Sequence, residues 1–172
     1  MKVFFVFLTV VFSQFVFATP DHPKHAPVAM PKEFEMLKKL VGTWEGTTKM
    51  GDKEEKTTVT YELTSNGTVI TEKLGAGTPM EMVSIYHKDG KSLAMTHFCA
   101  LGNHPQMNLL KADDKAISFE MKKSIGVSSM KEPHMHAMKI TFDSDDAVTH
   151  EWTSFDNGKK KDTVIFNFKR KL

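Results

Sequence analysis

Residues 134–155, HMHAMKITFDSDDAVTHEWTSF, decide the fold of this chain. Two runs of alternating apolar and polar residues, 134–142 and 147–155, flank an acidic turn at 143–146. Alternation with a period of two is typical of strands that bury one face, and Asp and Ser are frequent in turns. The stretch therefore predicts an antiparallel hairpin whose even-numbered apolar residues face the core.

Similar runs, rich in β-branched and aromatic residues, recur from residue 43 to the C-terminus, with Gly, Asn and Asp in the turns between them. No helical period interrupts them, which indicates an antiparallel meander. Closing the meander removes its exposed edges. We therefore expect an all-β protein, an up-and-down barrel of about eight to ten strands. The expected strands are residues 43–49, 56–63, 69–74, 81–87, 92–100, 106–111, 116–122, 134–142, 147–155 and 160–169.

Three segments precede the first strand. Residues 1–18 combine Lys2, an apolar run and a small residue at Ala18, which is typical of a signal peptide. Residues 19–31 contain four prolines and two histidines without an apolar period, which predicts a disordered leader. Apolar residues at helical spacing then predict one short helix at 32–40, so the folded domain should span 32–172.

The signal peptide predicts a processed, exported protein, either periplasmic or secreted. We expect cleavage after Ala18, so that N-terminal sequencing of exported protein should read from Thr19. A mature protein that begins at another residue, or that retains Met1, would contradict this assignment.

Composition narrows the possible partners. The chain has 23 Lys and Arg against 21 Asp and Glu, and this near balance argues against nucleic acid as the main partner. Cys99 is the only cysteine, so the chain has no internal disulfide, and no cysteine stands directly after the cleavage site to carry a lipid. The apolar run at the N-terminus is too short to favour a membrane span, so no stable membrane anchor is expected.

Histidines in three of the expected strands share parity with the apolar residues that must face inward. The alternation places His97, His134, His136 and His150 on the core side, with Cys99 and Trp152 beside them. Imidazole can bind a metal, hydrogen-bond a ligand or transfer a proton. The pattern therefore predicts a histidine patch in one cavity, formed by these six residues.

Three uses of this patch stay open. Histidines in a barrel pocket can hydrogen-bond a ligand, and Asn103 in a turn could assist. His97, His134, His136 and His150 could instead bind zinc, which needs three or four ligands around one ion. They could also be core residues with buried polar partners. No nucleophile motif or pair of catalytic carboxylates is present, so no catalytic residue is assigned.

Residues 40–46, LVGTWEG, resemble the opening of the calycin superfamily, which includes lipocalins, fatty-acid-binding proteins and nitrobindins. Three later blocks, 77–82 (GTPMEM), 96–107 (THFCALGNHPQM) and 134–136 (HMH), are similar to secreted bacterial proteins with a lipocalin-like domain. The resemblance covers most of residues 37–171. It implies a ligand-binding barrel in which Trp44 closes one end beneath the helix, and it brings no established activity.

Nitrobindins hold haem through a histidine near the C-terminus, but residues 163–168 of this chain contain none, and His150 is the nearest substitute. This departure weakens the case for haem. The sequence thus favours an exported barrel that binds a small, partly apolar ligand, with residues 124–133 as a portal loop. The alternative is a zinc or haem protein, or a small cavity enzyme, that uses the same histidines.

Overall fold

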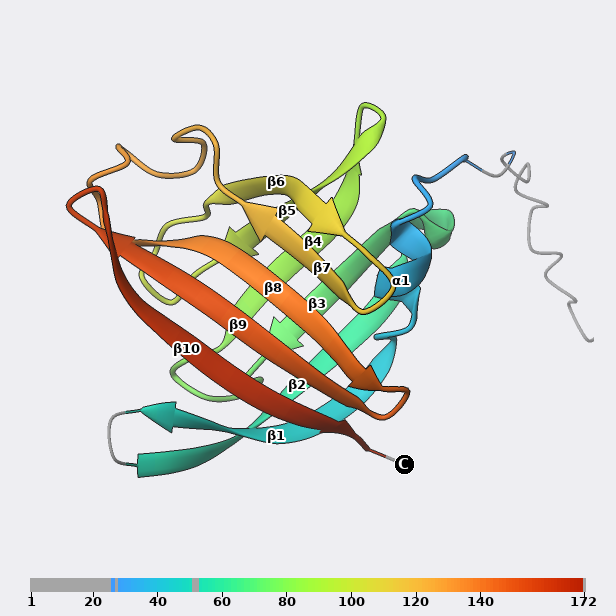
Figure 1. The fold of residues 1–172 in the computed structure, drawn as a ribbon, viewed down its shortest axis with the longest axis horizontal. Coiled ribbons are helices and arrows are strands. Elements are labelled where there is room, and N and C mark those ends of the chain that lie inside the picture. Colours follow the sequence, from blue (N-terminus) through green and yellow to red (C-terminus); the bar gives the residue numbers. More distant parts are fainter. Residues whose placement is uncertain (1–25, 27, 51–52, 172) are drawn as a thin grey trace, which may run out of the picture.

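The computed structural model describes residues 26, 28–50 and 53–171. The predicted signal peptide and most of the predicted leader lie outside the described residues. Ten antiparallel strands close into one barrel in the order β1-β10-β9-β8-β7-β6-β5-β4-β3-β2, which confirms the predicted fold class (Figure 1). The strands are β1 Gly42–Met50, β2 Lys53–Thr64, β3 Val69–Leu74, β4 Met82–Asp89, β5 Ser92–Phe98, β6 Gln106–Ala112, β7 Ala116–Glu120, β8 His134–Ser144, β9 Ala147–Asp156 and β10 Lys159–Arg170.

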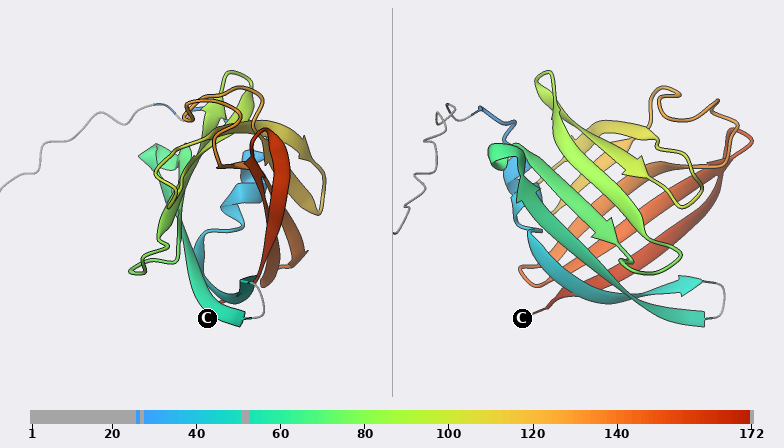
Figure 2. Two further views of the ribbon diagram at one scale, coloured as in Figure 1. Left: turned by 90° about the vertical axis from the view of Figure 1, so that its left-hand side faces the viewer. Right: turned by 180° about the vertical axis from the view of Figure 1, so that it is seen from behind.

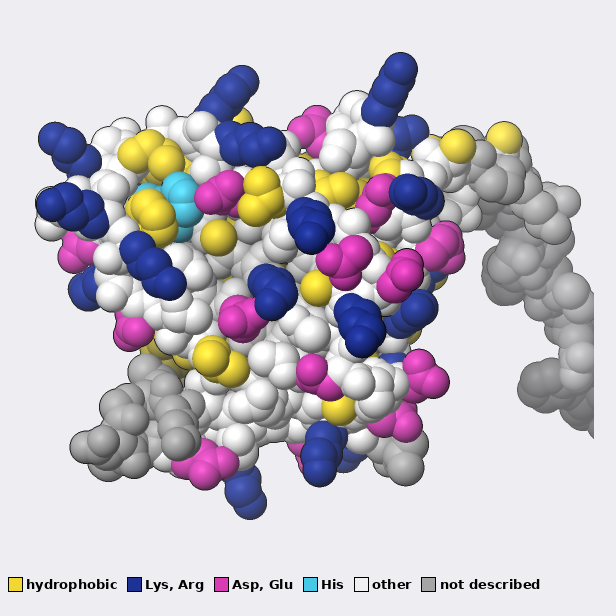
Figure 3. Space-filling view, viewed as in Figure 1, with side chains coloured by type: hydrophobic (Ala, Val, Ile, Leu, Met, Phe, Trp, Pro, Cys, Tyr) yellow, Lys and Arg dark blue, Asp and Glu magenta, His cyan; other side chains and the backbone are white. Residues whose placement is uncertain are grey.

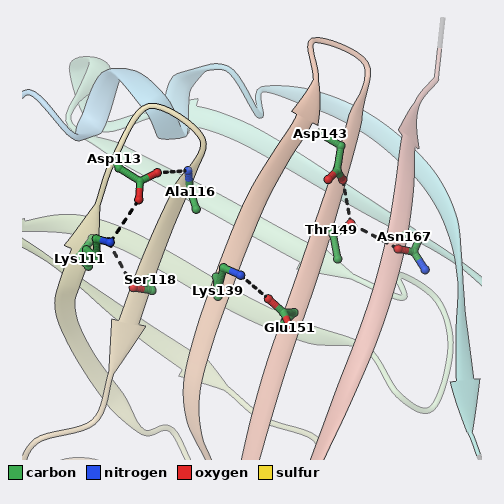
Figure 4. A network of polar contacts seen from close by, with 9 residues as sticks. All are labelled: Lys111, Asp113, Ala116, Ser118, Lys139, Asp143, Thr149, Glu151 and Asn167. Carbon is green, nitrogen blue, oxygen red and sulfur yellow. Dashed lines mark hydrogen bonds and ion pairs between the residues drawn. The ribbon is translucent and has the colours of Figure 1, made fainter.

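The hairpin of β8 and β9 forms as its alternation predicts. Met138 pairs with Trp152 and Ile140 pairs with His150, and all four side chains are buried. Between them on the outer face, the Nζ atom of Lys139 lies 2.8 Å from the Oε2 atom of Glu151 (Figure 4). In an antiparallel sheet with one face in solvent, alternate residues face the core and the solvent, so mainly apolar pairs lie inside and a charged pair lies outside.

One end of the barrel is closed by the helix α1, Phe34–Lys38, which is shorter than the predicted 32–40 but lies within it (Figure 2). Phe34 and Leu37 of this helix are fully buried, as is Leu40. The indole of Trp44 is also buried and donates a hydrogen bond from Nε1 to the carbonyl oxygen of Leu40, at 2.7 Å. The predicted placement of Trp44 beside the helix is confirmed.

The opposite end, called the open end below, is ringed by connections between strands. Among the described residues they are the β3–β4 and β9–β10 connections, the β5–β6 loop at 99–105, and residues 121–133 before β8. Residues 121–133 form no helix or strand, which includes the long connection predicted at 124–133, while β7 ends two residues before the predicted end at residue 122. In the described part of the chain, no helix is long and apolar enough to span a membrane.

The outer surface carries both signs of charge. Lysine, arginine and acidic side chains are interspersed on the face that Figure 3 shows. This mixture agrees with the near balance of 23 basic and 21 acidic residues in the sequence.

Candidate functional site

The barrel interior contains a layer of buried polar side chains. His150 of β9 has no exposed surface, and its Nε2 atom lies 3.1 Å from the hydroxyl oxygen of Tyr61 on β2. The ring of Phe168 packs edge-on against the imidazole, with the ring centres 4.9 Å apart. The Nδ1 atom of His150 is buried without a hydrogen-bond partner.

His97 of β5 belongs to the same interior. Its Nδ1 atom lies 3.0 Å from the hydroxyl oxygen of Ser84, which is its partner across the β4–β5 pair. The imidazole is 1% exposed, and its ring centre is 4.4 Å from that of Trp152 on β9. Neither Nε2 of His97 nor Nε1 of Trp152 has a hydrogen-bond partner, although both atoms are buried.

The centre of this layer is Glu72 on β3, a residue that the sequence analysis missed. Glu72 is completely buried and accepts a hydrogen bond of 2.5 Å from the hydroxyl of Tyr86 and one of 3.4 Å from that of Ser84. The sequence indicates this inward position, because Glu72 alternates in step with Ile70 and Leu74, which are buried on the same strand. An inward carboxyl group in a strand is a strong indication of a buried polar site.

Burial controls the ionisation of this layer. It raises the pKa of Glu72, and hydrogen bonds from Tyr86, Tyr61 and Ser84 oppose that rise. Burial, followed by the negative charge of Glu72, raises the pKa of both Tyr61 and Tyr86 well above the usual value. Burial also lowers the pKa of His97 to about 4 and that of His150 to about 3, so both imidazoles are neutral at pH 7.

His134 and His136 form a separate pair. A β-bulge between Met135 and Ala137 shifts the register, so that His134 pairs with Phe155, on the face of β9 opposite to Trp152. The ring of His136 stacks on Phe155 at 3.8 Å. Both histidines are nevertheless buried, at 0% and 8% exposure. In the described structure their polar and ring contacts are with each other, Phe155, Glu120 and Glu132, and not with His97 or His150. That all four histidines share one cavity stays a prediction.

The polar contacts of the His134–His136 pair run from the backbone at Glu132 to the carboxylate of Glu120. The Nδ1 atom of His134 donates to the carbonyl oxygen of Glu132, which can only accept. The Nε2 atom of His134 lies 3.1 Å from Nδ1 of His136, and Nε2 of His136 lies 3.9 Å from a carboxylate oxygen of Glu120. Burial, and then the nearby His134, lower the pKa of His136, while Glu120 raises it.

Two further predicted site residues lie in the β5–β6 loop. Cys99 is half-buried, and burial raises the pKa of its thiol. The Asn103 side chain is mostly buried, and its Nδ2 atom donates to Oε1 of Glu132 at 2.8 Å and to the carbonyl oxygen of Pro133 at 2.9 Å. Asn103 thus ties this loop to residues 121–133, and its amide nitrogen is engaged within the protein.

The arrangement of these residues does not suit a metal ion. Among the described residues, no three His, Cys, Asp or Glu side chains are grouped closely enough to hold one. His150 is not placed to bind a haem iron, because its Nε2 atom is hydrogen-bonded to the hydroxyl of Tyr61. The rings of Tyr61 and Phe168 also pack against the imidazole.

A pocket of about 270 Å³ opens beside this polar layer at the open end. Its apolar wall includes Leu74, Met82 and Phe166, which face inward from three strands. On β3 and β4, Leu74 pairs with Met82, and the next inward pair is Glu72 with Ser84. Leu74 and Met82 of the pocket wall therefore lie two residues along their strands, roughly 6.5–7 Å, from Glu72 and Ser84. Its remaining lining residues are Thr48, Glu55, Lys56, Thr57, Gly75, Thr78, Pro79 and Met80.

No protein-family model matches the chain, and no curated protein sequence matches it. Its fold is similar to that of Rv2717c from M. tuberculosis, at 14% sequence identity and a TM-score of 0.56, over 84% of this chain and 100% of that one. It is also similar to a protein of unknown function of the DUF3598 family from Nostoc punctiforme, at 15% identity and a TM-score of 0.55. That match covers 78% of this chain and 49% of the Nostoc protein, so this chain spans about half the length of that protein. At these identities the likeness is one of fold alone.

Proposed function

We propose that this calycin-like barrel binds one small, partly apolar molecule at its open end. The observation that carries the proposal is the pocket of about 270 Å³ walled by Leu74, Met82 and Phe166. Ligand sites in proteins are concave, mostly apolar and equipped with a few polar groups, and the mouths of β-barrels are a frequent place for them. The pocket and the adjacent polar layer together supply these features.

The two parts of the site have different roles in this proposal. Apolar side chains at the mouth exclude water from the body of the ligand, and each Å² of apolar surface buried contributes about 25 cal/mol. The buried groups beyond Leu74 and Met82 offer hydrogen bonds to a polar end of the ligand. Polar atoms in such a desolvated place discriminate between ligands, because an unmatched polar group there costs roughly 1–3 kcal/mol.

We infer that binding takes place after export. Lys2, the apolar run that follows it and Ala18 support this proposal, since together they are typical of a cleaved signal peptide. A lone, half-buried Cys99 suits an oxidising compartment, where an exposed thiol would be open to oxidation.

A fluorescence titration with N-phenyl-1-naphthylamine, an apolar dye, tests the binding proposal. The Met82→Trp substitution should fill the pocket and weaken dye binding by about tenfold or more, because the bulkier ring occupies the space that the dye needs. The matched control is Ile165→Trp, which adds a similar ring beside Phe166 in the chain but on the outer face, where Ile165 is 45% exposed.

The control variant should bind the dye like the wild-type protein, and thermal melts should show that both variants are folded. Equal dye affinity in the Met82→Trp variant and the wild type would contradict the assigned pocket. A wild-type protein that does not bind the dye would contradict the proposed function itself.

A further inference from the structure

Two buried polar atoms of the barrel interior have no partner and lie on rings in contact. They are Nε2 of His97 and Nε1 of Trp152, on side chains that are 1% and 2% exposed. The two ring centres are 4.4 Å apart, with the planes tilted by 41°. Buried polar groups are nearly always hydrogen-bonded, so these two nitrogens on rings in contact are candidates for binding a polar group of a ligand.

The hydrogen bonds on the other side of His97 determine what its Nε2 atom offers. The hydroxyl group of Ser84 has one hydrogen, and it donates that hydrogen to Oε1 of Glu72. Ser84 must therefore accept from Nδ1 of His97, 3.0 Å away. A neutral imidazole that carries its hydrogen on Nδ1 has a free lone pair on Nε2, so His97 presents an acceptor. The indole Nε1 of Trp152 can only donate.

We propose that this acceptor and this donor bind a hydroxyl group of the ligand, so that the ligand class is an apolar alcohol or phenol. The hydroxyl oxygen accepts from Nε1 of Trp152, and its hydrogen is donated to Nε2 of His97. An ether or a carbonyl oxygen can only accept, and a hydrocarbon can do neither. The assignment rests on the proposed function, since it requires that a ligand enter the open end.

The register of the strands connects this hydroxyl site with the pocket. Ser84 lies two positions after the pocket residue Met82 on β4 and faces the same side. Its hydroxyl group is hydrogen-bonded to His97 on β5. Two residues of a strand span roughly 6.5–7 Å. In this proposal, a ligand of one or two rings rests against Met82 and Leu74 and extends its hydroxyl group past Ser84 toward the His97–Trp152 pair.

Isothermal titration calorimetry with two probes of similar shape tests this inference. 1-Naphthol carries the hydroxyl group, and 1-methylnaphthalene has a methyl group in its place. We expect 1-naphthol to bind roughly tenfold more tightly, since the methyl compound leaves both nitrogens unpartnered. The Trp152→Phe variant keeps an aromatic ring without the donor, and it should reduce this preference to about twofold or less. Trp44→Phe is the matched control, because Nε1 of Trp44 already donates to Leu40.

Nuclear magnetic resonance of the wild-type protein gives a second readout, for which a variant is needed only to assign the signals. The chain has two tryptophans, so a ¹H–¹⁵N spectrum should contain two indole signals, which the Trp44→Phe variant assigns. Addition of 1-naphthol should shift the Trp152 signal and leave the Trp44 signal in place, whereas 1-methylnaphthalene should change the Trp152 signal far less.

The outcomes separate the two proposals. Equal affinities for the two probes, or an unchanged preference in Trp152→Phe, would show that the nitrogens bind only water and would overturn the hydroxyl assignment while leaving the apolar pocket intact. Failure of both probes to bind would instead contradict the proposed function.

Discussion

Lowering the pH from 7 to 4 is expected to reduce the free energy of unfolding by about 3 kcal/mol through His150 alone. Burial lowers the pKa of His150 to about 3 in the folded protein, from an ordinary value of 6.5. The unfolded chain therefore takes up a proton below pH 6.5 while the folded chain does not, so the equilibrium shifts toward unfolding as the pH falls. The stability from this residue is fully present above pH 6.5 and is lost progressively down to about pH 3.

Urea unfolding at pH 7 and pH 4 measures this effect when the wild-type protein is compared with a His150→Gln variant. The variant has no imidazole to titrate, so its loss of stability between the two pH values should be smaller by about 3 kcal/mol. Tyr61→Phe is the matched control, because it removes the same hydrogen bond and leaves His150 in place. It should lower stability at both pH values without removing the titration of His150. An identical pH dependence in His150→Gln and the wild type would contradict the assignment of His150 as neutral and buried.

Two neighbours modify the total pH dependence, and the variant comparison separates them from His150. His97 acts in the same direction, since burial lowers its pKa to about 4. Glu72 acts in the opposite direction, because burial raises its pKa in the folded state. The contribution of Glu72 is fully present at low pH, and it is lost as the pH rises through the folded-state pKa. Only the difference between the wild type and His150→Gln isolates the imidazole of His150.

Trp44→Ala is expected to lower the free energy of unfolding by about 3–5 kcal/mol. The Trp44 side chain is 1% exposed beneath α1, so its loss leaves a cavity that the closed end cannot fill without moving the helix. It also leaves the carbonyl oxygen of Leu40 without its 2.7 Å hydrogen bond and removes the ring under the guanidinium of Arg170, which lies 4.1 Å from the ring centre. Equilibrium urea unfolding at neutral pH measures the change.

Trp44→Phe is the control for the packing part of this effect. Phenylalanine keeps most of the buried aromatic surface and loses only the donor, so it should cost about 1–2 kcal/mol. A loss of less than about 1 kcal/mol in Trp44→Ala would contradict the view that this tryptophan holds the helix on the barrel.

Local patterns in the sequence determined the strands and much of their direction. Met138, Ile140 and Trp152 face the core because alternation lets the hairpin bury one face, and a one-residue slip of either strand would turn its apolar residues outward. The same reasoning placed His97 and His150 correctly in the interior, since each lies on a regular stretch beside buried apolar neighbours. The same parity also places Glu72 in the interior, between Ile70 and Leu74.

Long-range contacts decided what the alternation could not. A β-bulge adds one residue, His136, to β8 against β9, and His134 lies beyond it. The bulge depends on how the two strands pair and not on the residue types within β8. Asn103 is likewise bound by Glu132 and Pro133, residues about thirty positions away. A turn residue looks free in sequence, and only the packed loops show where its amide group is used.

Gly46, where β1 meets β10 and closes the barrel, shows both what the sequence indicates and what only the structure identifies. The sequence places Gly46 in the first strand, where an interior glycine by itself indicates a bulge or a close approach. The structure identifies the close approach, since a Cβ atom on Gly46 would lie 2.1 Å from the carbonyl oxygen of Asn167 on β10. Alternation and turns thus determined the strands and their inward faces, because they act between neighbours in the chain. The partner across the closing seam, and the polar atoms brought together inside it, were decided by the tertiary structure, because they depend on strands that lie far apart in sequence.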